Sequence, residues 1–294
     1  MSFLTYFING LSLGSIYAII ALGYTMVYGI AKMLNFAHGD FIMVGCYVVF
    51  TVVSTMGLNP LVGIAASIVI CTLLGIITEK VAYKPLRNAG SPLAVLITAI
   101  GVSYFLENAA LLIFGADTKA FTSVIKWEGV ILANGALKIQ GVTIITIAIS
   151  LVILAVLQTF IYKTKAGQAM LAVSEDKGAA SLMGIDVNKT ISLTFAIGSS
   201  LAAIAGVLMC SAYPSLTPYT GAMPGIKAFV AAVLGGIGSI PGAMIGGLIL
   251  GIIEILGKTY VSSQLSDAIV FGILVIVLIV KPTGILGKNI QEKV

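Results

Sequence analysis

Long apolar runs, separated by short polar segments, make up most of this chain of 294 residues. Only 9% of the residues are charged, whereas soluble domains carry about a quarter, so the composition excludes an ordinary globular protein. Five runs are about as long as the roughly 20 residues that cross a hydrocarbon core: 4–30, 60–78, 92–114, 141–162 and 190–212. Shorter or interrupted runs occupy 41–55, 226–256 and 265–280. The pattern predicts an all-α polytopic membrane protein, a single domain over residues 1–294, with about eight transmembrane helices plus one broken or re-entrant segment.

The first interruption is AKMLNFAHGD, residues 31–40, which separates two apolar helices with almost no room for a conventional loop. It carries Asn35, His38 and Asp40. Either these side chains cap a tight cytoplasmic turn, or they line a cavity at a broken helix. Ionisable groups within a membrane usually face a cavity or a partner. We therefore treat these three residues and Glu107 as candidates for a pathway or its gate.

A second interruption follows residues 226–236, which are apolar but too few to cross the membrane. The sequence GIGSIPGAMIGG then precedes a further apolar run. Non-helical backbone at membrane depth is tolerated only where protein or water satisfies its hydrogen bonds. We expect a half-helix, a break and a full return helix, with Gly235, Gly236 and Gly238 as further pathway or gate candidates.

Basic residues gather in a few loops, which predicts the orientation of the chain. Short basic loops stay on the cytoplasmic side, so 79–91, 163–189 and 281–294 are expected there. The segment 115–140 has charges of both signs and the single Trp, and it is expected outside. The N-terminus is then outside and the C-terminus cytoplasmic. Because the net charge of +5 comes from these loops, it indicates membrane orientation and not nucleic-acid binding.

The cytoplasmic loop 163–189 reads as a helix, which is unusual for a segment that only turns the chain around. Its middle is rich in Ala, Met, Leu, Glu and Lys, which favour helix. Apolar residues recur at helical spacing at Met170, Val173, Ala180 and Met183. We predict a helix over 168–184 that ends at Gly184 and docks on a soluble partner. The alternative is a surface helix that lies among the lipid headgroups.

Catalytic or metal chemistry finds no support in the sequence. His38 is the only histidine, so neither a metal site nor a serine nucleophile with its base can be assembled with confidence. Five residues separate Gly251 from Gly257, one more than a nucleotide-binding P-loop allows. We expect no enzyme activity, no metal and no cofactor on this chain.

Four stretches resemble the permeases of branched-chain amino acid ABC importers, and among these the shorter, LivH-type permease. They are residues 9–41, 174–185, 231–251 and 281–287. The resemblance extends over essentially the whole chain. It implies an ABC importer permease fold in the bacterial cytoplasmic membrane. It also implies a second homologous permease, two cytoplasmic ATPase subunits that bind ATP and Mg, and an extracytoplasmic substrate-binding protein.

Within this resemblance, the loop 163–189 would hold the coupling helix that meets the ATPase. Its positions Ala179, Ala180 and Gly184 match the EAA-x-x-x-G loop of ABC importers. Gly178 stands where that loop usually has Glu, and Glu175 and Asp176 precede it by up to one turn. Either acid could be the one that meets the ATPase.

The resemblance implies leucine, isoleucine and valine, or related neutral amino acids, as substrates. Urea or short amides are the alternative within the family. From another class, a self-sufficient ion-coupled secondary transporter or channel would use Asp40 or Glu107 as a proton or ion site. ATP-dependent uptake that uncouplers do not affect would separate the two classes.

Overall fold

The computed structural model describes residues 2–87, 92–132 and 137–287. Within these residues, seven helices are long and apolar enough to cross a membrane. They are α1 (Ser2–Ala31), α2 (His38–Phe50, continued by a π-helical turn over Thr51–Thr55), α3 (Pro60–Thr78, continued by helical turns over Glu79–Tyr83 and Lys84–Leu86), α4 (Pro92–Phe114), α5 (Gly141–Lys163), α8 (Val187–Ala212) and α10 (Ile240–Tyr260). The remaining elements are α6 (Lys165–Glu175), α7 (Lys177–Leu182), α9 (Ala222–Gly235), α11 (Ser266–Val280), β1 (Lys119–Ala120), β2 (Val130–Leu132), β3 (Leu137–Ile139) and β4 (Ser215–Leu216).

The all-α polytopic prediction is confirmed, although the number of full spans differs from the prediction. The described chain has seven long helices and two shorter apolar ones, α9 and α11, instead of eight spans and one broken segment. α11 has 15 residues, about 22 Å of helix, which is less than the roughly 30 Å hydrocarbon core. Residues 88–91, 133–136 and 288–294, which fall in three of the predicted loops, lie outside the described residues.

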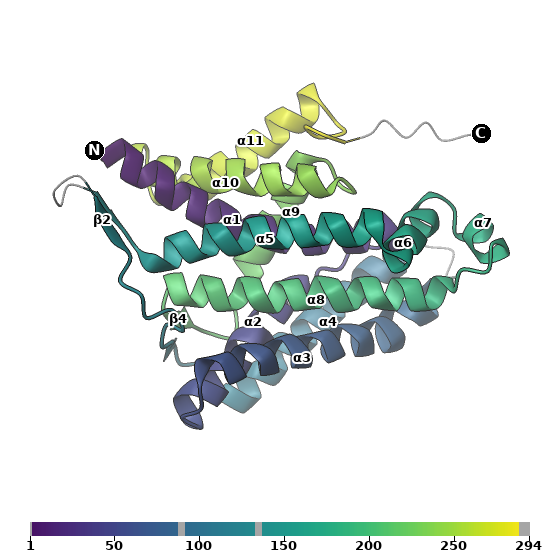
Figure 1. Ribbon diagram of the computed structural model, residues 1–294, viewed down its shortest axis with the longest axis horizontal. Helices are drawn as coiled ribbons and strands as arrows, with labels where there is room; N and C mark the ends of the chain where they lie inside the picture. Colours follow the sequence, from purple (N-terminus) through teal and green to yellow (C-terminus); the bar gives the residue numbers. More distant parts are fainter. Residues whose placement is uncertain (1, 88–91, 133–136, 288–294) are drawn as a thin grey trace.

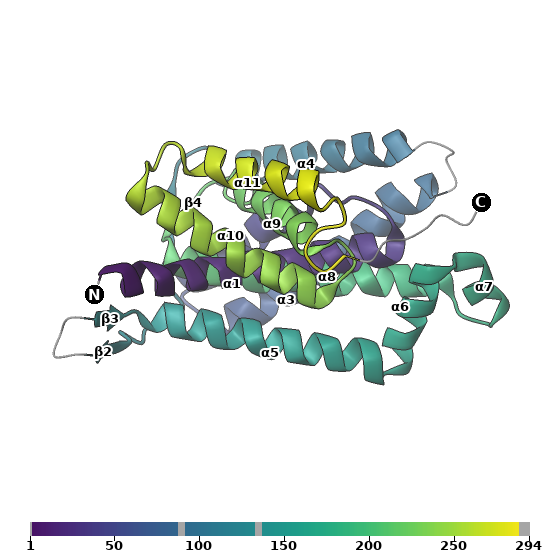
Figure 2. The same ribbon diagram turned by 90° about the horizontal axis from the view of Figure 1, so that it is seen from above.

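The long helices run along the longest axis of the molecule, whose two ends differ in structure (Figure 1). The start of α1 and the antiparallel β2–β3 hairpin lie at one end, and α6 and α7 lie at the other, as Figure 2 also shows. We call these the hairpin end and the α7 end. The segments 115–140 and 163–189, predicted on opposite sides of the membrane, therefore lie at opposite ends of the molecule.

α1 is the central helix of the fold. Of an 18-residue stretch of α1, 89% is buried, against 22% in α4 and in α5. Glycines let the backbone of α10 approach it closely. A Cβ at Gly14 would lie 2.7 Å from the carbonyl oxygen of Leu248, and one at Gly251 would lie 2.1 Å from the backbone nitrogen of Gly14. Such small-residue contacts let membrane helices pack backbone to backbone, and here they make α1 and α10 the core of the molecule.

The loop 163–189 is not one helix over 168–184, as predicted, but two helices that meet at Asp176. The Asp176 carboxylate accepts hydrogen bonds from the backbone N–H groups of Gly178 and Ala179, at 2.7 and 2.9 Å. It therefore begins a new helix, because an Asp side chain competes with a continuing helix for backbone donors. Gly184 follows α7 with a left-handed φ of 82°, which agrees with the predicted end.

The predicted half-helix, break and return helix are α9, a short turn and α10. Helix-end carbonyl groups inside a membrane protein need donors. The backbone N–H groups of Ile285 and Leu286 donate to the carbonyl oxygens of Leu234 and Gly235, each at 2.9 Å. Gly236 has a φ of 104°, which residues with a side chain rarely adopt. The segment after α11 thus satisfies the broken end of α9.

A buried ion-pair network joins four helices, α1, α9, α10 and α11. The Glu254 carboxylate is 1% exposed and accepts hydrogen bonds from Lys227 Nζ at 2.8 Å, Lys258 Nζ at 2.5 Å and Tyr17 Oη at 2.8 Å. Lys227 Nζ also lies 2.7 Å from Asp267 Oδ1. Two cations and two anions therefore satisfy one another where α9, α10 and α11 meet α1.

Candidate transport pathway and coupling surface

The break between α1 and α2 lies inside the protein. Lys32 has a φ of 58°, the one positive value among the described residues other than glycine, and it turns the chain back after α1. Asn35, His38 and Asp40 are all buried. The Tyr83 hydroxyl donates a hydrogen bond to Asn35 Oδ1 at 2.7 Å. Of the two readings that the sequence left open, burial favours side chains at a broken helix over caps of an exposed turn.

α2 begins at this break, and glycines determine what packs around its first turn. The His38 ring lies 4.5 Å from the Tyr24 ring, centroid to centroid. A Cβ at Gly23 would lie 2.5 Å from His38 Nε2, so only glycine leaves room for the imidazole. A Cβ at Gly39 would lie 2.7 Å from the carbonyl oxygen of Gly221, which directly precedes α9. The N-terminal ends of α2 and α9 are therefore in backbone contact.

A cavity of about 250 Å³ lies where α2, α4 and α9 meet. Asp40 and Glu107, both predicted as pathway residues, line this cavity together. Ser103 of α4 and Tyr24 of α1 add hydroxyl groups to its wall. Ser103 and Tyr24 carry no signal in the sequence that marks them as pathway residues, because one hydroxyl in an apolar helix is an ordinary feature.

The predicted glycines lie at the other end of α9, away from this cavity. A Cβ at Gly29 would lie 3.2 Å from the Cα of Gly238, so the turn after α9 rests against the end of α1. Asn35 and Ile237 share a narrow hollow. The structure therefore brings the two breaks side by side, but it places only the α2 side of the first break at the cavity.

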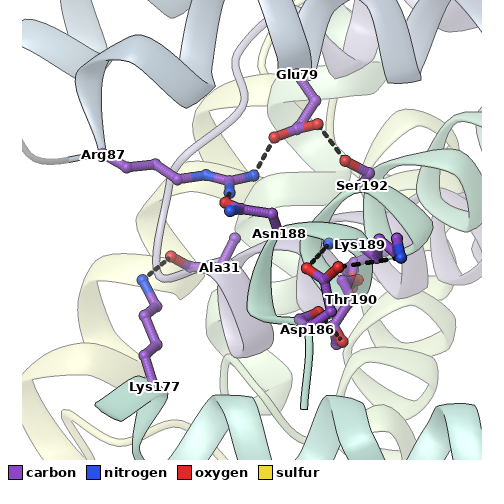
Figure 3. A network of polar contacts seen from close by, with 10 residues as sticks. Ala31, Glu79, Arg87, Lys177, Asp186, Asn188, Lys189, Thr190 and Ser192 are labelled. Atoms are coloured by element: carbon purple, nitrogen blue, oxygen red, sulfur yellow. Dashed lines mark hydrogen bonds and ion pairs between the residues drawn. The ribbon is translucent and has the colours of Figure 1, made fainter. Parts of the chain in front are cut away.

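A polar network closes the α7 end between α3 and α8 (Figure 3). The buried Glu79 carboxylate pairs with the Arg87 guanidinium and accepts a hydrogen bond from Ser192 Oγ at 2.5 Å. The Arg87 guanidinium also donates to Asn188 Oδ1 at 2.7 Å. Burial lowers the pKa of Arg87, and the neighbouring Glu79 opposes this shift. These contacts fix the start of α8, where the chain leaves α7, against the end of α3.

Lys177, the first residue of α7, contacts the end of α1 just before the break. Its Nζ donates a hydrogen bond to the carbonyl oxygen of Ala31 at 3.0 Å, as Figure 3 shows. Burial lowers the pKa of Lys177, and the positive charges of Arg87 and Lys32 add to this effect. Ala31 is the last residue of α1, so α7 is tied directly to the point where the chain turns back toward the cavity.

The residues predicted to couple to an ATPase differ in their exposure. Glu175, Asp176, Ala179 and Gly184 are exposed at the α7 end. Ala180 is 4% exposed, so its side chain packs within this chain and does not face outward. Asp176 holds the start of α7, and so it acts first as a helix cap.

Two large apolar side chains, on α7 and its C-cap, face outward, and of these the sequence prediction included Met183 but not Leu182. Leu182 is 90% exposed and Met183 is 82% exposed, although both lie outside the membrane-spanning helices. Met183 was predicted to share the face of Met170 and Val173, which are buried. The sequence signal that could have found Leu182 is its place beside Met183, in a run of two large apolar residues directly before the Gly184 cap. We call Lys177–Gly184 the α7 surface.

Comparisons with known proteins identify the family of this chain. The family described as branched-chain amino acid transport system / permease component matches residues 6–278. The high-affinity branched-chain amino acid transport system permease protein LivH of Escherichia coli (strain K12) is 45% identical over 302 residues, covering 99% of this chain and 98% of that protein. The corresponding BraD protein of Pseudomonas aeruginosa is 44% identical, with the same coverage. The autoinducer 2 import system permease protein LsrD of Escherichia coli O9:H4 (strain HS) is 26% identical, covering 89% of this chain and 87% of that protein. The chain is a multi-pass membrane protein and belongs to the family of permease components of branched-chain amino acid transport systems.

Proposed function

We propose that this chain carries leucine, isoleucine and valine, or related neutral amino acids, across the bacterial cytoplasmic membrane, and that ATP hydrolysis on partner subunits drives the transport. Similarity to LivH and BraD over almost the whole chain supports the substrate class. The observation that carries the ATP-driven part is the exposed pair Leu182 and Met183. Exposed apolar side chains outside the membrane-spanning helices support a surface for a protein partner.

The proposed assembly contains a second homologous permease, two ATPase subunits and an extracytoplasmic binding protein. The ATPase subunits dock on the α7 surface. The second permease packs against α4 and α9, where Ile100, Tyr104 and Ile226 are exposed around the cavity. A cavity open on this face becomes an enclosed pathway when the second permease covers it.

Coupling follows from the contacts of α7. An ATPase that moves the α7 surface also moves Lys177, and with it the end of α1 at Ala31. The chain between Ala31 and His38 contains no helix, so it can change its path without breaking helical hydrogen bonds. Asp40 lies two residues beyond this segment. Movement at α7 would thus reach the cavity through a few residues of non-helical chain.

Two alternatives remain testable. LsrD, a relative at 26% identity, is named for the import of autoinducer 2, so similarity to this family does not fix the solute, and urea or a short amide is the alternative substrate. The buried Asp40 at the cavity favours an ion-coupled transporter as the second candidate, because carboxylates in membranes often serve as proton or ion sites.

Uptake into proteoliposomes tests the proposed function. The permease pair and ATPases are reconstituted with the binding protein outside and ATP inside, and radiolabelled leucine is followed with and without a protonophore. We expect uptake that requires ATP and the binding protein and that the protonophore leaves unchanged. Uptake that the protonophore abolishes, with no need for ATP, would assign the ion-coupled class instead.

The orientation is tested by labelling single cysteines from each side of the membrane, in a background without the native cysteines. We propose that the α7 end and the C-terminus are cytoplasmic and that the hairpin end and the N-terminus are outside. A cysteine in place of Lys126 should react with an impermeant maleimide from outside. A cysteine in place of Lys189 should react from the cytoplasmic side. The reverse pattern would overturn this topology.

A further inference from the structure

Asp40 is exceptional among the buried acidic side chains of the described residues. Three are buried, namely Asp40, Glu79 and Glu254. Glu79 pairs with Arg87, and Glu254 pairs with two lysines, whereas Asp40 pairs with no cation of the described chain. Asp40 is 2% exposed, and its Oδ2 atom has no hydrogen-bond partner. A buried carboxylate is unfavourable unless a cation or a donor reaches it, and on Asp40 the Ser103 hydroxyl is the side-chain donor while Oδ2 is left without one.

Asp40 lies in the wall of the cavity between α2, α4 and α9. Glu107, half-buried, brings a second carboxyl group to the same cavity. Phe36, Ile100 and Ile226 make the rest of the wall largely apolar. At about 30 Å³ per water, a volume of about 250 Å³ holds roughly eight waters or one small solute.

The same cavity also favours an anionic group on its α2–α9 side. α2 and α9, of 13 and 14 residues, both begin there, since Gly39 and Ala222 are part of the wall. Helix N-termini carry a partial positive charge that favours a carboxylate. Here this charge acts without most of the backbone donors, because the N–H groups of His38, Asp40 and Ala222 already donate within the chain. A ligand that satisfies the whole cavity therefore has a cationic group, an anionic group and a small apolar part.

We infer that this cavity is a substrate site within the permease and that it holds a zwitterionic aliphatic amino acid during its passage. Asp40, with Glu107 nearby, receives the ammonium group, the N-terminal ends of α2 and α9 face the carboxylate, and Phe36, Ile100 and Ile226 contact the side chain. The inference rests on the proposed function and deepens it. It also excludes urea and short amides as good ligands, because they lack the ammonium group that Asp40 requires.

The test is the number of leucine molecules taken up per ATP hydrolysed, measured on the reconstituted complex with its binding protein. We expect Asp40→Asn to lower this ratio about ten- to a hundred-fold, because a charge-assisted hydrogen bond to the ammonium group is lost. The matched control is Asn108→Ala, on α4 but outside the cavity, which should keep the wild-type ratio. An unchanged ratio in Asp40→Asn would overturn the inference. A wild-type complex without ATP-driven uptake would instead contradict the proposed function.

A second measurement decides the question if the Asp40 variant does not assemble. Ser103→Cys places a thiol in the cavity wall of an otherwise cysteine-free complex, and Gln168→Cys places one on the exposed surface of α6, outside the membrane-spanning helices. In the vanadate-trapped complex, leucine should slow maleimide labelling at position 103 several-fold and leave position 168 unchanged. Equal labelling with and without leucine would refute the site. Leucine uptake by the wild type is also measured with potassium in place of sodium. If this exchange lowers uptake as far as Asp40→Asn does, Asp40 binds an inorganic cation, and the amino-acid site is refuted.

Discussion

Replacing Leu182 and Met183 together by Asp is expected to abolish the stimulation of ATP hydrolysis by the loaded binding protein. The two side chains are 90% and 82% exposed on a surface outside the membrane-spanning helices. If they fill an apolar groove of the ATPase, a carboxylate in that groove would be desolvated without a partner. A buried anchor at the centre of an interface is worth about 2 kcal/mol or more, and the loss of two such anchors would separate the subunits. Copurification of the ATPase and its stimulated activity measure the effect.

The matched control is Gln168→Asp, which adds the same charge to an exposed position of the neighbouring α6. It should copurify and respond to the binding protein as the wild type does. The double Asp variant should still insert and keep its fold, since neither side chain packs against the chain. If the double variant keeps full stimulation, the α7 surface does not dock the ATPase.

Glu254→Leu is expected to lower the free energy of unfolding by about 3–5 kcal/mol, because it leaves a buried lysine without its main partner. Glu254 accepts from Lys227, Lys258 and Tyr17, and removing the carboxylate also strands the Tyr17 hydroxyl. SDS titration of the detergent-solubilised protein measures the change.

Two further variants test whether the loss of stability comes from the buried Glu254–Lys227 pair or from any substitution in these helices. Asp267→Ala removes the half-exposed partner of Lys227 and should cost about 1 kcal/mol or less. Adding Lys227→Met to Glu254→Leu should recover part of the lost stability, because an apolar pair replaces the unpaired charge. A loss in Glu254→Leu as small as the roughly 1 kcal/mol expected for Asp267→Ala would show that the network is not needed for the fold.

The apolar runs predict most of the fold, because each spanning helix satisfies its own backbone and the bilayer fixes its length. The breaks at 31–40 and after 235 were also predicted, since polar and glycine-rich residues interrupt those runs. Asp40 and Glu107 line one cavity, and their role as pathway residues stays a proposal.

Other features depend on contacts between distant segments, which one sequence does not record. β1 pairs with β4, with Lys119 opposite Leu216, across almost a hundred residues of chain. The hydrogen bonds from Ile285 and Leu286 to the end of α9 are of the same kind. Composition also predicted one helix over 168–184, because propensity summed over a window does not detect the local cap at Asp176.

The outward face of α7 illustrates the same limit. Helical spacing grouped Ala180 and Met183 on one side, yet Ala180 is buried within the chain and Met183 is exposed. The break at Asp176 changes the direction of the helix, so a periodicity carried across it assigns the wrong face. A bulky residue at Ala180 would therefore disturb the packing of this chain before it could reach a partner.

Photo-cross-linking from the α7 surface tests the coupling proposal most directly. A photoreactive amino acid replaces Leu182 in the permease of the assembled complex in native membranes, and a second variant carries it at Lys126 near the hairpin end. Docking on α7 predicts that position 182 captures the ATPase subunit and that position 126 does not. Capture of lipid alone from position 182, in a complex that still hydrolyses ATP, would mean that α7 lies on the membrane surface and would contradict the proposal.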